Sequence, residues 1–268
     1  MKIFDCFMYF DEDLILDLRL NYLNKYVDHF VIVESKYNHN GEKREPLFDI
    51  NKFKKFENKI IYLLLDHECK DFSKINDGDN LDLVAGKKVM NALKRENYQR
   101  NFLYNGLTKA EEDDWIIISD LDEVPNLENN DLKKVKNKIV FFKQMMIYYK
   151  LNLFLEEFPW IGSKACKKKD LKSPQWLRNI KDRNYSWWRF DTFFSNTKYS
   201  NIKIFKNGGW HFSYIKSPED IEKKLKSYLH HVEYDLNPVG KKKISELIKQ
   251  KKTVYDLKVD SRSNKFLE

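Results

Sequence analysis

The residues with the clearest chemical potential form an acidic cluster directly after an apolar run. Asp120, Asp122 and Glu123 follow residues 115–119, Trp-Ile-Ile-Ile-Ser. A short apolar run that ends in carboxylates predicts a buried strand that delivers acids to the edge of a sheet. Because neighbouring carboxylates repel one another, a divalent metal with oxygen ligands commonly neutralises them and leaves positions open for a phosphate-bearing ligand. The alternative is a strand end followed by a solvated acidic turn.

Spacing within this cluster indicates which side chains would meet a metal. Asp120 and Asp122 lie two residues apart, so in an extended segment both face one ion. Glu123 then points away, and it suits a residue that orients the ligands or pairs with a basic side chain. His211 is a candidate third ligand, since imidazole binds manganese beside carboxylates. A histidine flanked by aromatic residues is also typical of a hydrogen-bonded core position.

Five other charged residues are candidates for ligand binding or catalysis. Arg100 suits a bidentate contact to a diphosphate or to one of the carboxylates, or else a surface ion pair of little energetic weight. Glu34 and Asp66 end two expected strands, and they suit hydrogen bonds to a ribose or base, or capping in the loops that follow. Asp191, which follows an aromatic stretch, and Glu219 compete as the general base, although an acid at a helix N-terminus also explains Glu219.

The elements that position these residues alternate between strand and helix. Strands are expected at residues 1–10, 29–34, 60–65, 115–119 and 139–149. Helices are expected after residues 11–13, over residues 83–107, and from Ser217, where Pro218 fits the first helical position. This order predicts an α/β fold with a mainly parallel central sheet flanked by helices, and with ligands at the carboxyl ends of the strands.

Composition favours a folded α/β chain and bears on its partners. Of the 268 residues, 42% are hydrophobic and 15% aromatic, so the chain is not disordered. Its 49 Lys and Arg against 41 Asp and Glu give a net charge of +8. Because this excess is scattered, nucleic acid is not the expected partner, whereas peripheral contact with an anionic membrane surface stays open.

Cysteine usage and hydropathy bear on location. Cys6, Cys69 and Cys166 are odd in number and far apart, with no Cys-x-x-Cys spacing, which favours a reducing compartment. No apolar stretch approaches the roughly 18 residues that span a bilayer. We therefore expect a cytoplasmic protein without a transmembrane segment.

Four motifs follow one another along roughly residues 1–230. They are Val33-Glu34-Ser35 with Gly41 and Pro46-Leu47, then Leu65-Asp66-His67, then Ser119 to Pro125, and finally Gly209 to Ser213 with Pro218-Glu219. In this order they resemble glycosyltransferase family 17, the family of β-1,4-mannosyl-glycoprotein 4-β-N-acetylglucosaminyltransferase. The acidic motif alone is common to many metal enzymes, but the four together make the resemblance fairly specific.

The resemblance implies a GT-A fold and an inverting transfer from a nucleotide sugar, whose diphosphate is held by Mn²⁺ or Mg²⁺. The implied donor is UDP-N-acetylglucosamine, and the implied acceptor is a glycan. By this resemblance the metal residues are Asp120, Asp122 and His211, and the donor pocket contains Glu34, Asp66, Arg100 and Asp120. We interpret the chain as a single domain, with a nucleotide-sugar-binding half at residues 1–125, an acceptor side at residues 126–235 and a basic helical tail at residues 236–268.

Two other functions fit part of the sequence. A phosphatase of the haloacid-dehalogenase type would use Asp120 as its nucleophile, because an Asp-x-Asp element after a strand is typical of that class. Against it, such a motif usually opens its domain, whereas several strands and helices come first here. A basic module that binds nucleic acid or an anionic surface is the alternative that is not an enzyme, and its affinity would fall steeply with salt.

Overall fold

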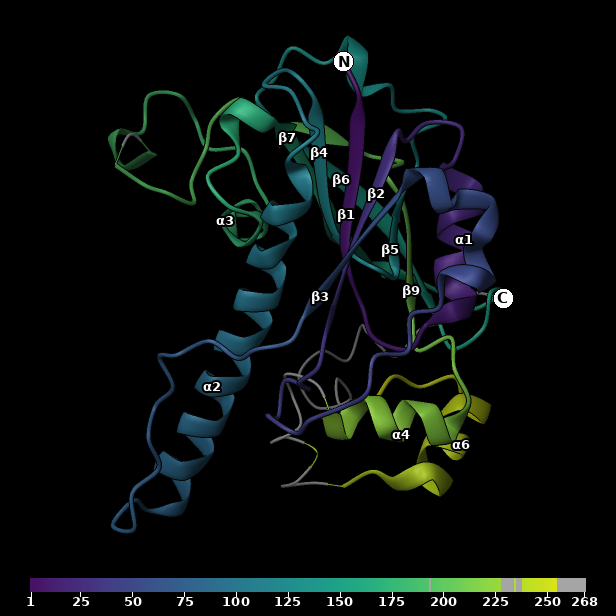
Figure 1. Ribbon diagram of the computed structural model, residues 1–268, viewed down its shortest axis with the longest axis vertical. Helices are drawn as coiled ribbons and strands as arrows, with labels where there is room; N and C mark the ends of the chain where they lie inside the picture. The colour runs from purple at the N-terminus through teal and green to yellow at the C-terminus, as the bar shows by residue number, and fades with distance from the viewer. Residues whose placement is uncertain (193, 228–233, 235–237, 255–268) are drawn as a thin grey trace.

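The computed structural model describes residues 1–192, 194–227, 234 and 238–254, and its strands form one nine-stranded sheet flanked by helices (Figure 1). The strands are β1 (Ile3–Tyr9), β2 (His29–Ser35), β3 (Ile60–Leu65), β4 (Trp115–Asp120), β5 (Glu123–Pro125), β6 (Ile139–Tyr148), β7 (Phe154–Lys167), β8 (Lys203–Phe205) and β9 (Gly209–Ser213). The α-helices are α1 (Asp13–Leu23), α2 (Leu81–Phe102), α3 (Pro174–Asn179), α4 (Pro218–Ser227) and α6 (Gly240–Lys249). Short 3₁₀ helices include η1 (Ile50–Lys59), η2 (Leu103–Leu107), η3 (Leu132–Lys134), η4 (Lys168–Asp170) and η5 (Phe190–Thr192).

The first half of the chain builds the parallel part of the sheet. Its strands lie in the order β3-β2-β1-β4, and each neighbouring pair is parallel. All four coincide with apolar runs that predict strands, within a few residues at the ends. The carboxyl ends of these strands therefore meet at one edge, as the alternation of strand and helix predicts.

The second half makes the sheet mixed, so the prediction of a mainly parallel sheet is corrected. β7 lies antiparallel to β4 and to β6. β9 and β8 run parallel to β6, and β5 is antiparallel to β9. The physical reason lies between residues 149 and 153, where a short turn joins β6 directly to β7, and parallel neighbours would need a long crossover instead.

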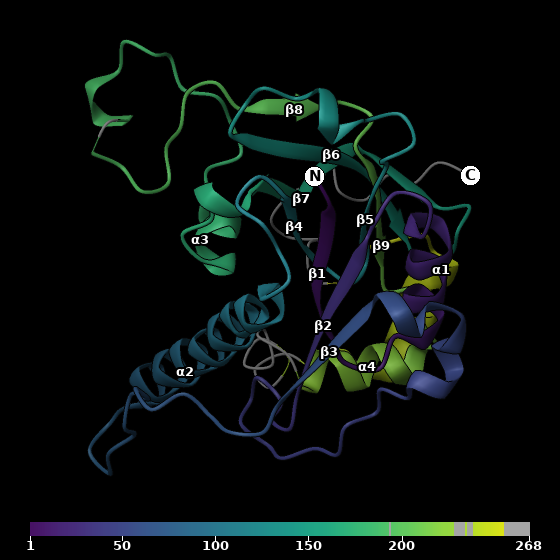
Figure 2. The same cartoon turned by 45° about the horizontal axis from the view of Figure 1, so that its top comes forward.

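Side chains of successive strand residues point to opposite faces of the sheet, so the core has one cluster on each face. Trp115 and Ile117 pack into a cluster with Leu16 and Leu20 of α1. Ile116 and Ile118 pack on the opposite face, in a cluster that includes Leu103 of η2. Because β1, β2 and β4 each contribute residues to both clusters, these central strands are buried on both sides. Figures 1 and 2 show α1 on one side of the sheet and α2 with α3 on the other.

Helix ends follow the sequence signals. The side chain of Asn80 accepts the N–H of Leu83 at the start of α2, and Ser217 Oγ accepts the N–H of Asp220 at 3.2 Å at the start of α4. The expected helix over residues 83–107 is α2 followed by η2. α6 is one helix of the predicted basic tail, whose residues 236, 237 and 255–268 lie outside the described part. Among the described helices, none combines the length and apolarity needed to cross a membrane.

Candidate active site

The turn between β4 and β5 carries the acidic cluster. β4 ends at Asp120 and β5 begins at Glu123, so Asp122 lies in the turn. β5 pairs with β9 in antiparallel register, which sets Glu123 opposite His211. The N–H of Phe212 also donates to the carbonyl oxygen of Asp122 at 2.8 Å. This strand pairing brings a histidine from far along the chain to the acids.

A buried arginine supports the same turn from the face covered by α1. Arg19 of α1 is fully buried and forms an ion pair of 2.6 Å with Asp5, which is also fully buried in β1. Its Nη1 donates to the carbonyl oxygens of Asp120, Leu121 and Glu123, at 3.1, 3.0 and 2.7 Å. Arg19 therefore fixes the backbone from which the acidic side chains project.

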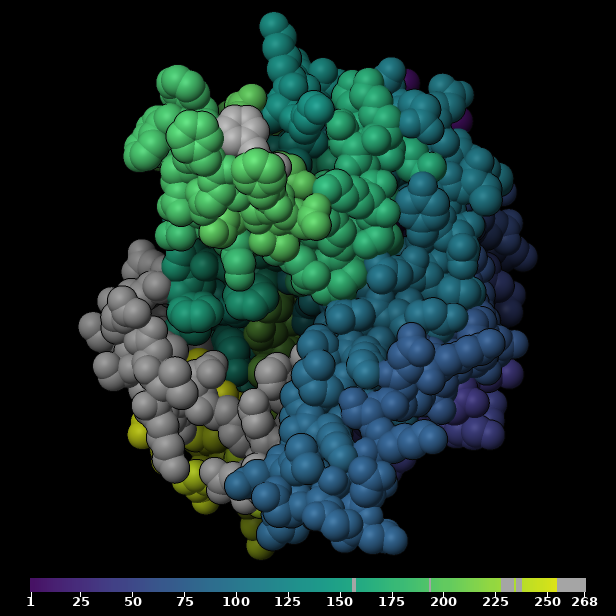
Figure 3. Space-filling view, turned by 90° about the vertical axis from the view of Figure 1, so that its left-hand side faces the viewer, coloured from purple at the N-terminus to yellow at the C-terminus, as the bar shows by residue number. Residues whose placement is uncertain are grey.

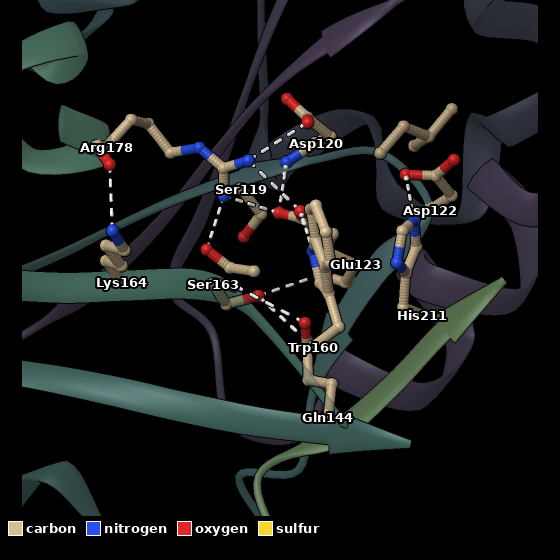
Figure 4. A network of polar contacts seen from close by, with 12 residues as sticks. Ser119, Asp120, Asp122, Glu123, Gln144, Trp160, Ser163, Lys164, Arg178 and His211 are labelled. Atoms are coloured by element: carbon tan, nitrogen blue, oxygen red, sulfur yellow. Dashed lines mark hydrogen bonds and ion pairs between the residues drawn. The ribbon is translucent and has the colours of Figure 1, made fainter. Parts of the chain in front are cut away.

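Two arginines hold the carboxylate of Asp120. Arg100 of α2 donates to Oδ1 at 3.0 Å. Arg178 of α3 donates to Oδ2 at 3.1 Å, a contact drawn in Figure 4. Burial alone would raise the pKa of Asp120, but the positive charges of Arg178 and Arg100 outweigh it and hold this pKa well below its ordinary value. Asp120 is therefore ionised across the physiological range, and each of its oxygens already has a cationic partner.

Glu123 organises the buried side of this network. Its carboxylate accepts the backbone N–H of Asp120 at 2.8 Å and the indole N–H of Trp160 at 2.7 Å. Arg178 binds both of its oxygens, at 2.6 and 3.0 Å. The side chain is 1% exposed, so these bonds compensate the cost of burying its charge. This placement agrees with the prediction that Glu123 pairs with a basic residue.

A close fit between α3 and β7 places Arg178. Lys164 of β7 donates to the carbonyl oxygens of Arg178 and Ile180 at 2.8 and 2.6 Å, which holds the end of α3 against the strand. Gly162 of β7 lies beneath the carboxylate of Glu123. A Cβ atom at this glycine would approach Glu123 Cδ to 2.4 Å, so only glycine fits there without displacing the network.

Asp122 belongs to a second group of charges, with looser contacts. Its Oδ1 lies 3.6 Å from His211 Nε2, and its Oδ2 lies 3.5 Å from Lys224 Nζ of α4. Lys224 also lies 3.3 Å from Glu12, which follows β1. The ring of His211 packs on Trp160, with 5.1 Å between the ring centroids. Two acids that are close in sequence are thus held by different cations.

A pocket of about 550 Å³ opens over both groups. Its lining includes Asp120, Asp122 and His211, together with residues at the carboxyl ends of β1 and β2 and on α2, β6, β7 and α4. Figure 3 shows the surface hollowed beside α2, below the green segment that contains α3. The volume is typical of a small-molecule site, and the position agrees with ligands at the carboxyl ends of parallel strands.

Comparison with known proteins identifies the family of the chain. A model of glycosyltransferase family 17 matches residues 1–265. The chain belongs to this family. It is therefore a glycosyltransferase, as the motifs predict. A search of curated proteins finds no match to the chain.

The donor atoms of this family 17 enzyme fit a divalent cation at Asp122 and His211. Ligands bound to one ion at about 2.0–2.2 Å lie roughly 3.0–3.6 Å apart, and Asp122 Oδ1 and His211 Nε2 are 3.6 Å apart. An oxygen and an imidazole nitrogen also suit manganese. In the described residues, three metal-binding side chains do not converge on one point. One carboxylate with one imidazole is nevertheless compatible with an ion that takes its other ligands from water and from a substrate diphosphate.

The other predicted site residues of the glycosyltransferase lie at different distances from the pocket. Arg100 reaches it through Asp120. Glu34 is fully buried behind the end of β2, where it accepts the N–H groups of Leu47 and Phe48 at 2.7 and 3.1 Å, so it holds the loop after β2. Asp66 is 66% exposed and lies 2.9 Å from His67.

Neither predicted base lines the pocket in the described structure. Asp191 lies in a projecting loop, where it pairs with Arg189 and Lys198 at 2.8 and 2.7 Å. Glu219 is 62% exposed on α4, near Lys241. Catalysis by Asp191 or Glu219, and donor binding by Glu34 or Asp66, stay predictions.

Sequence reasoning missed several charged residues of the site. Arg19 had a detectable signal, because it interrupts the apolar stripe of Leu16, Leu20 and Leu23 on α1, and an arginine there needs a buried partner. The sequence carries no such signal for Arg178, because α3 is short and the ion pairs of Arg178 depend on how α3 packs against the sheet. Lys224 is one of several lysines on α4, and nothing in the sequence separates it from a solvated one.

Proposed function

We propose that this glycosyltransferase moves a sugar from a UDP-sugar to a glycan acceptor, with inversion at the anomeric carbon and with the help of Mn²⁺ or Mg²⁺, on a GT-A fold. The observation that carries this proposal is the pocket over the β4–β5 turn, where Asp122 lies near His211 and Lys224, and Asp120 is held by two arginines. A polyanionic diphosphate with a divalent cation is the ligand chemistry that this mixture of acids and cations suits.

Asp122 and His211 would hold the ion, which would supply Lewis-acid stabilisation of the departing diphosphate. Asp120 could join them through the lone pairs that its bonds to Arg100 and Arg178 leave, but these two arginines compete with the ion for its charge. The contacts of Asp122 are 3.5 and 3.6 Å long, so its exchange costs less.

The basic side chains of the pocket support the same chemistry without relying on the ion. Lys224 lies on the pocket wall, beside Asp122. A cation fixed at this point stabilises the negative charge that grows on a leaving diphosphate, and groups of this kind typically contribute about 10²-fold to 10³-fold in rate. In this proposal, Lys224 turns from Asp122 toward the diphosphate when the donor binds.

The family match, rather than the surroundings of Asp120, argues against the phosphatase alternative. Residues 1–265 match glycosyltransferase family 17, and the acidic motif follows several strands and helices instead of opening the domain. The sugar itself is proposed from the family resemblance, which points to N-acetylglucosamine.

A thermal-shift panel of nucleoside diphosphates, with and without Mn²⁺, tests the proposal. A ligand at 100 times its dissociation constant stabilises a protein by about 2.7 kcal/mol, which for a domain of this size raises the melting temperature by roughly 5–10 °C. We expect this rise with UDP plus Mn²⁺, and a smaller one with UDP alone. Release of UDP from UDP-N-acetylglucosamine in the presence of acceptor glycans then tests turnover.

The matched variants are Asp122→Asn and Asp77→Asn. Asp77 is exposed and lies away from the pocket, so Asp77→Asn should keep the full response. Asp122→Asn should lose the part of the shift that requires Mn²⁺. Equal responses of the two variants would remove Asp122 from the site, and a flat panel for the wild-type protein would overturn the assignment of a UDP-sugar donor.

A further inference from the structure

The loop of residues 183–199, called here the aromatic loop, exposes four large aromatic side chains within eight residues. Trp187, Trp188, Phe190 and Phe194 are 79%, 65%, 81% and 91% exposed. Soluble surfaces rarely gather so much apolar area at one tip, and such a patch usually marks an interaction surface. Figures 1 and 2 show this loop projecting from the body beyond α3, on the side away from α1.

The base of the aromatic loop is tied together, so the exposed tip is presented by an ordered frame. The N–H of Lys181 donates to the carbonyl oxygen of Thr197 at 2.8 Å, and the N–H of Tyr185 donates to that of Tyr199 at 3.1 Å. Asp191 is held between Arg189 and Lys198. The aromatic tip is therefore an outward-facing feature of a closed loop.

Positive charge gathers beside the buried Tyr185, behind the tip. The cationic groups of Arg183, Arg189 and Lys198 lie 4.7, 5.3 and 5.9 Å from the ring centroid of the buried Tyr185. Residues 181–206 contain six Lys and Arg against two Asp. Tryptophan and phenylalanine at a tip with Lys and Arg behind them match the membrane interface, where rings enter the headgroup region and basic side chains meet anionic lipids.

The aromatic loop is separate from the catalytic pocket. Within the described residues, the lining of the pocket passes from Trp160 directly to His211 and takes nothing from the loop. Figure 3 shows the green segment on the same face of the molecule as the hollow. A surface bound by the tip would therefore lie on the side where the pocket opens, without closing the pocket.

We propose that the aromatic loop docks this enzyme on an anionic lipid surface, with Trp187, Trp188, Phe190 and Phe194 entering the interface and the net positive charge of residues 181–206 attracting anionic headgroups. Lipid is favoured over a sugar because the four side chains are 65–91% exposed and, in the described part of the chain, none of them lines the pocket over the acidic turn. Docking of this kind is peripheral and reversible, since a few aromatic rings bury little apolar area. It would bring the pocket to acceptors displayed at a membrane.

Co-sedimentation of the full chain with phosphatidylcholine vesicles, with and without phosphatidylserine, tests the proposal without any nucleotide or sugar. We expect binding to the phosphatidylserine vesicles that weakens as salt is raised. The double variant Trp187→Ser/Trp188→Ser should lower the partition coefficient by about tenfold or more, and Arg183→Gln should lower it less. Because these side chains are exposed, the melting temperature should stay unchanged.

Matched controls distinguish binding by the aromatic loop from nonspecific binding by other exposed apolar or basic residues. Leu14 of α1 is 68% exposed and Lys242 of α6 is exposed, so Leu14→Ser and Lys242→Gln should bind vesicles as the wild-type protein does. The proposal is overturned if the wild-type protein does not bind phosphatidylserine vesicles, or if the double tryptophan variant binds them as well as the wild type. A loss of acceptor affinity in that variant with vesicle binding unchanged would instead make the loop a glycan contact.

Discussion

Replacing Arg19 with methionine tests whether a buried guanidinium holds the acidic turn in place. Removing one partner of a buried ion pair costs roughly 3–5 kcal/mol, and Arg19 is paired with Asp5 at full burial. The change also leaves three turn carbonyls without this donor, at roughly 1–3 kcal/mol for each group that stays unsatisfied. Against a total stability of roughly 5–15 kcal/mol, we expect Arg19→Met to lose about 5 kcal/mol, because relaxation keeps such costs from adding fully.

Two companion variants separate the ion pair from the contacts to the turn. Asp5→Asn leaves the carbonyl contacts of Arg19 in place, so it should lose less stability than Arg19→Met and should keep turnover. Asp5→Leu/Arg19→Met replaces the buried pair with apolar side chains, which is often close to neutral. It should therefore recover part of the stability, while turnover stays low because the turn still lacks its donors.

Urea unfolding followed by tryptophan fluorescence gives the stabilities, and release of nucleoside diphosphate gives the turnover. An ordinary substitution changes the free energy of unfolding by about 1 kcal/mol. If Arg19→Met lies within that range of the wild-type protein and has normal turnover, the turn does not depend on Arg19. Full turnover in Asp5→Leu/Arg19→Met would refute the narrower claim that the carbonyl contacts position the acids.

Three further predictions concern the pocket wall and the glycine behind it. Lys224→Met should lower kcat/KM for the donor by about 10²-fold, and unchanged donor kinetics would show that Lys224 does not contact the diphosphate. Burial would raise the pKa of Glu12, but the positive charges of Lys224 and Lys216 lower this pKa from 4.5 to about 2. The ionised Glu12 should therefore stabilise the folded protein by about 3 kcal/mol above pH 4.5. This contribution should be lost as the pH falls toward 2. Glu12→Gln should remove this acid dependence from urea midpoints, whereas a slope equal to that of the wild-type protein would contradict it. Gly162→Ala should cost roughly 1–3 kcal/mol by overpacking Glu123, and a neutral effect on unfolding would show that the network can shift.

The parallel half of the fold could be predicted because each strand there is a separate apolar run. β2 and β3 lie where the sequence predicts them, and both are continuous in β-branched, aromatic or leucine residues between polar segments. The antiparallel half could not be predicted in the same way. The apolar pattern of β6 shows a strand, but it does not show that β7 returns beside it and joins β4. That choice depends on contacts between distant segments.

The candidate site shows the same division. Asp120, Asp122 and His211 are recognised from local motifs, and the structure brings all three to one pocket. The partners of these residues come from elements whose packing is not encoded locally, such as α3 with Arg178 and α4 with Lys224. A charged residue that looks solvated in the sequence becomes part of the site only when the tertiary fold places a carboxylate beside it.

The Asp-x-Asp pattern treats its two acids as equivalent, whereas their surroundings differ. An extended strand would direct both side chains to one ion, but β4 ends at Asp120, so the alternation of a strand does not continue to Asp122. Asp120 is drawn into the guanidinium network around Glu123, at 3.0 and 3.1 Å. Asp122 meets only the longer contacts to His211 and Lys224 that the structure describes. A cation binds most easily where it displaces the weakest contacts. On the function that we propose, Asp122 is therefore the acid at which an ion and its diphosphate would enter, and Asp120 would keep the arginines in place around them.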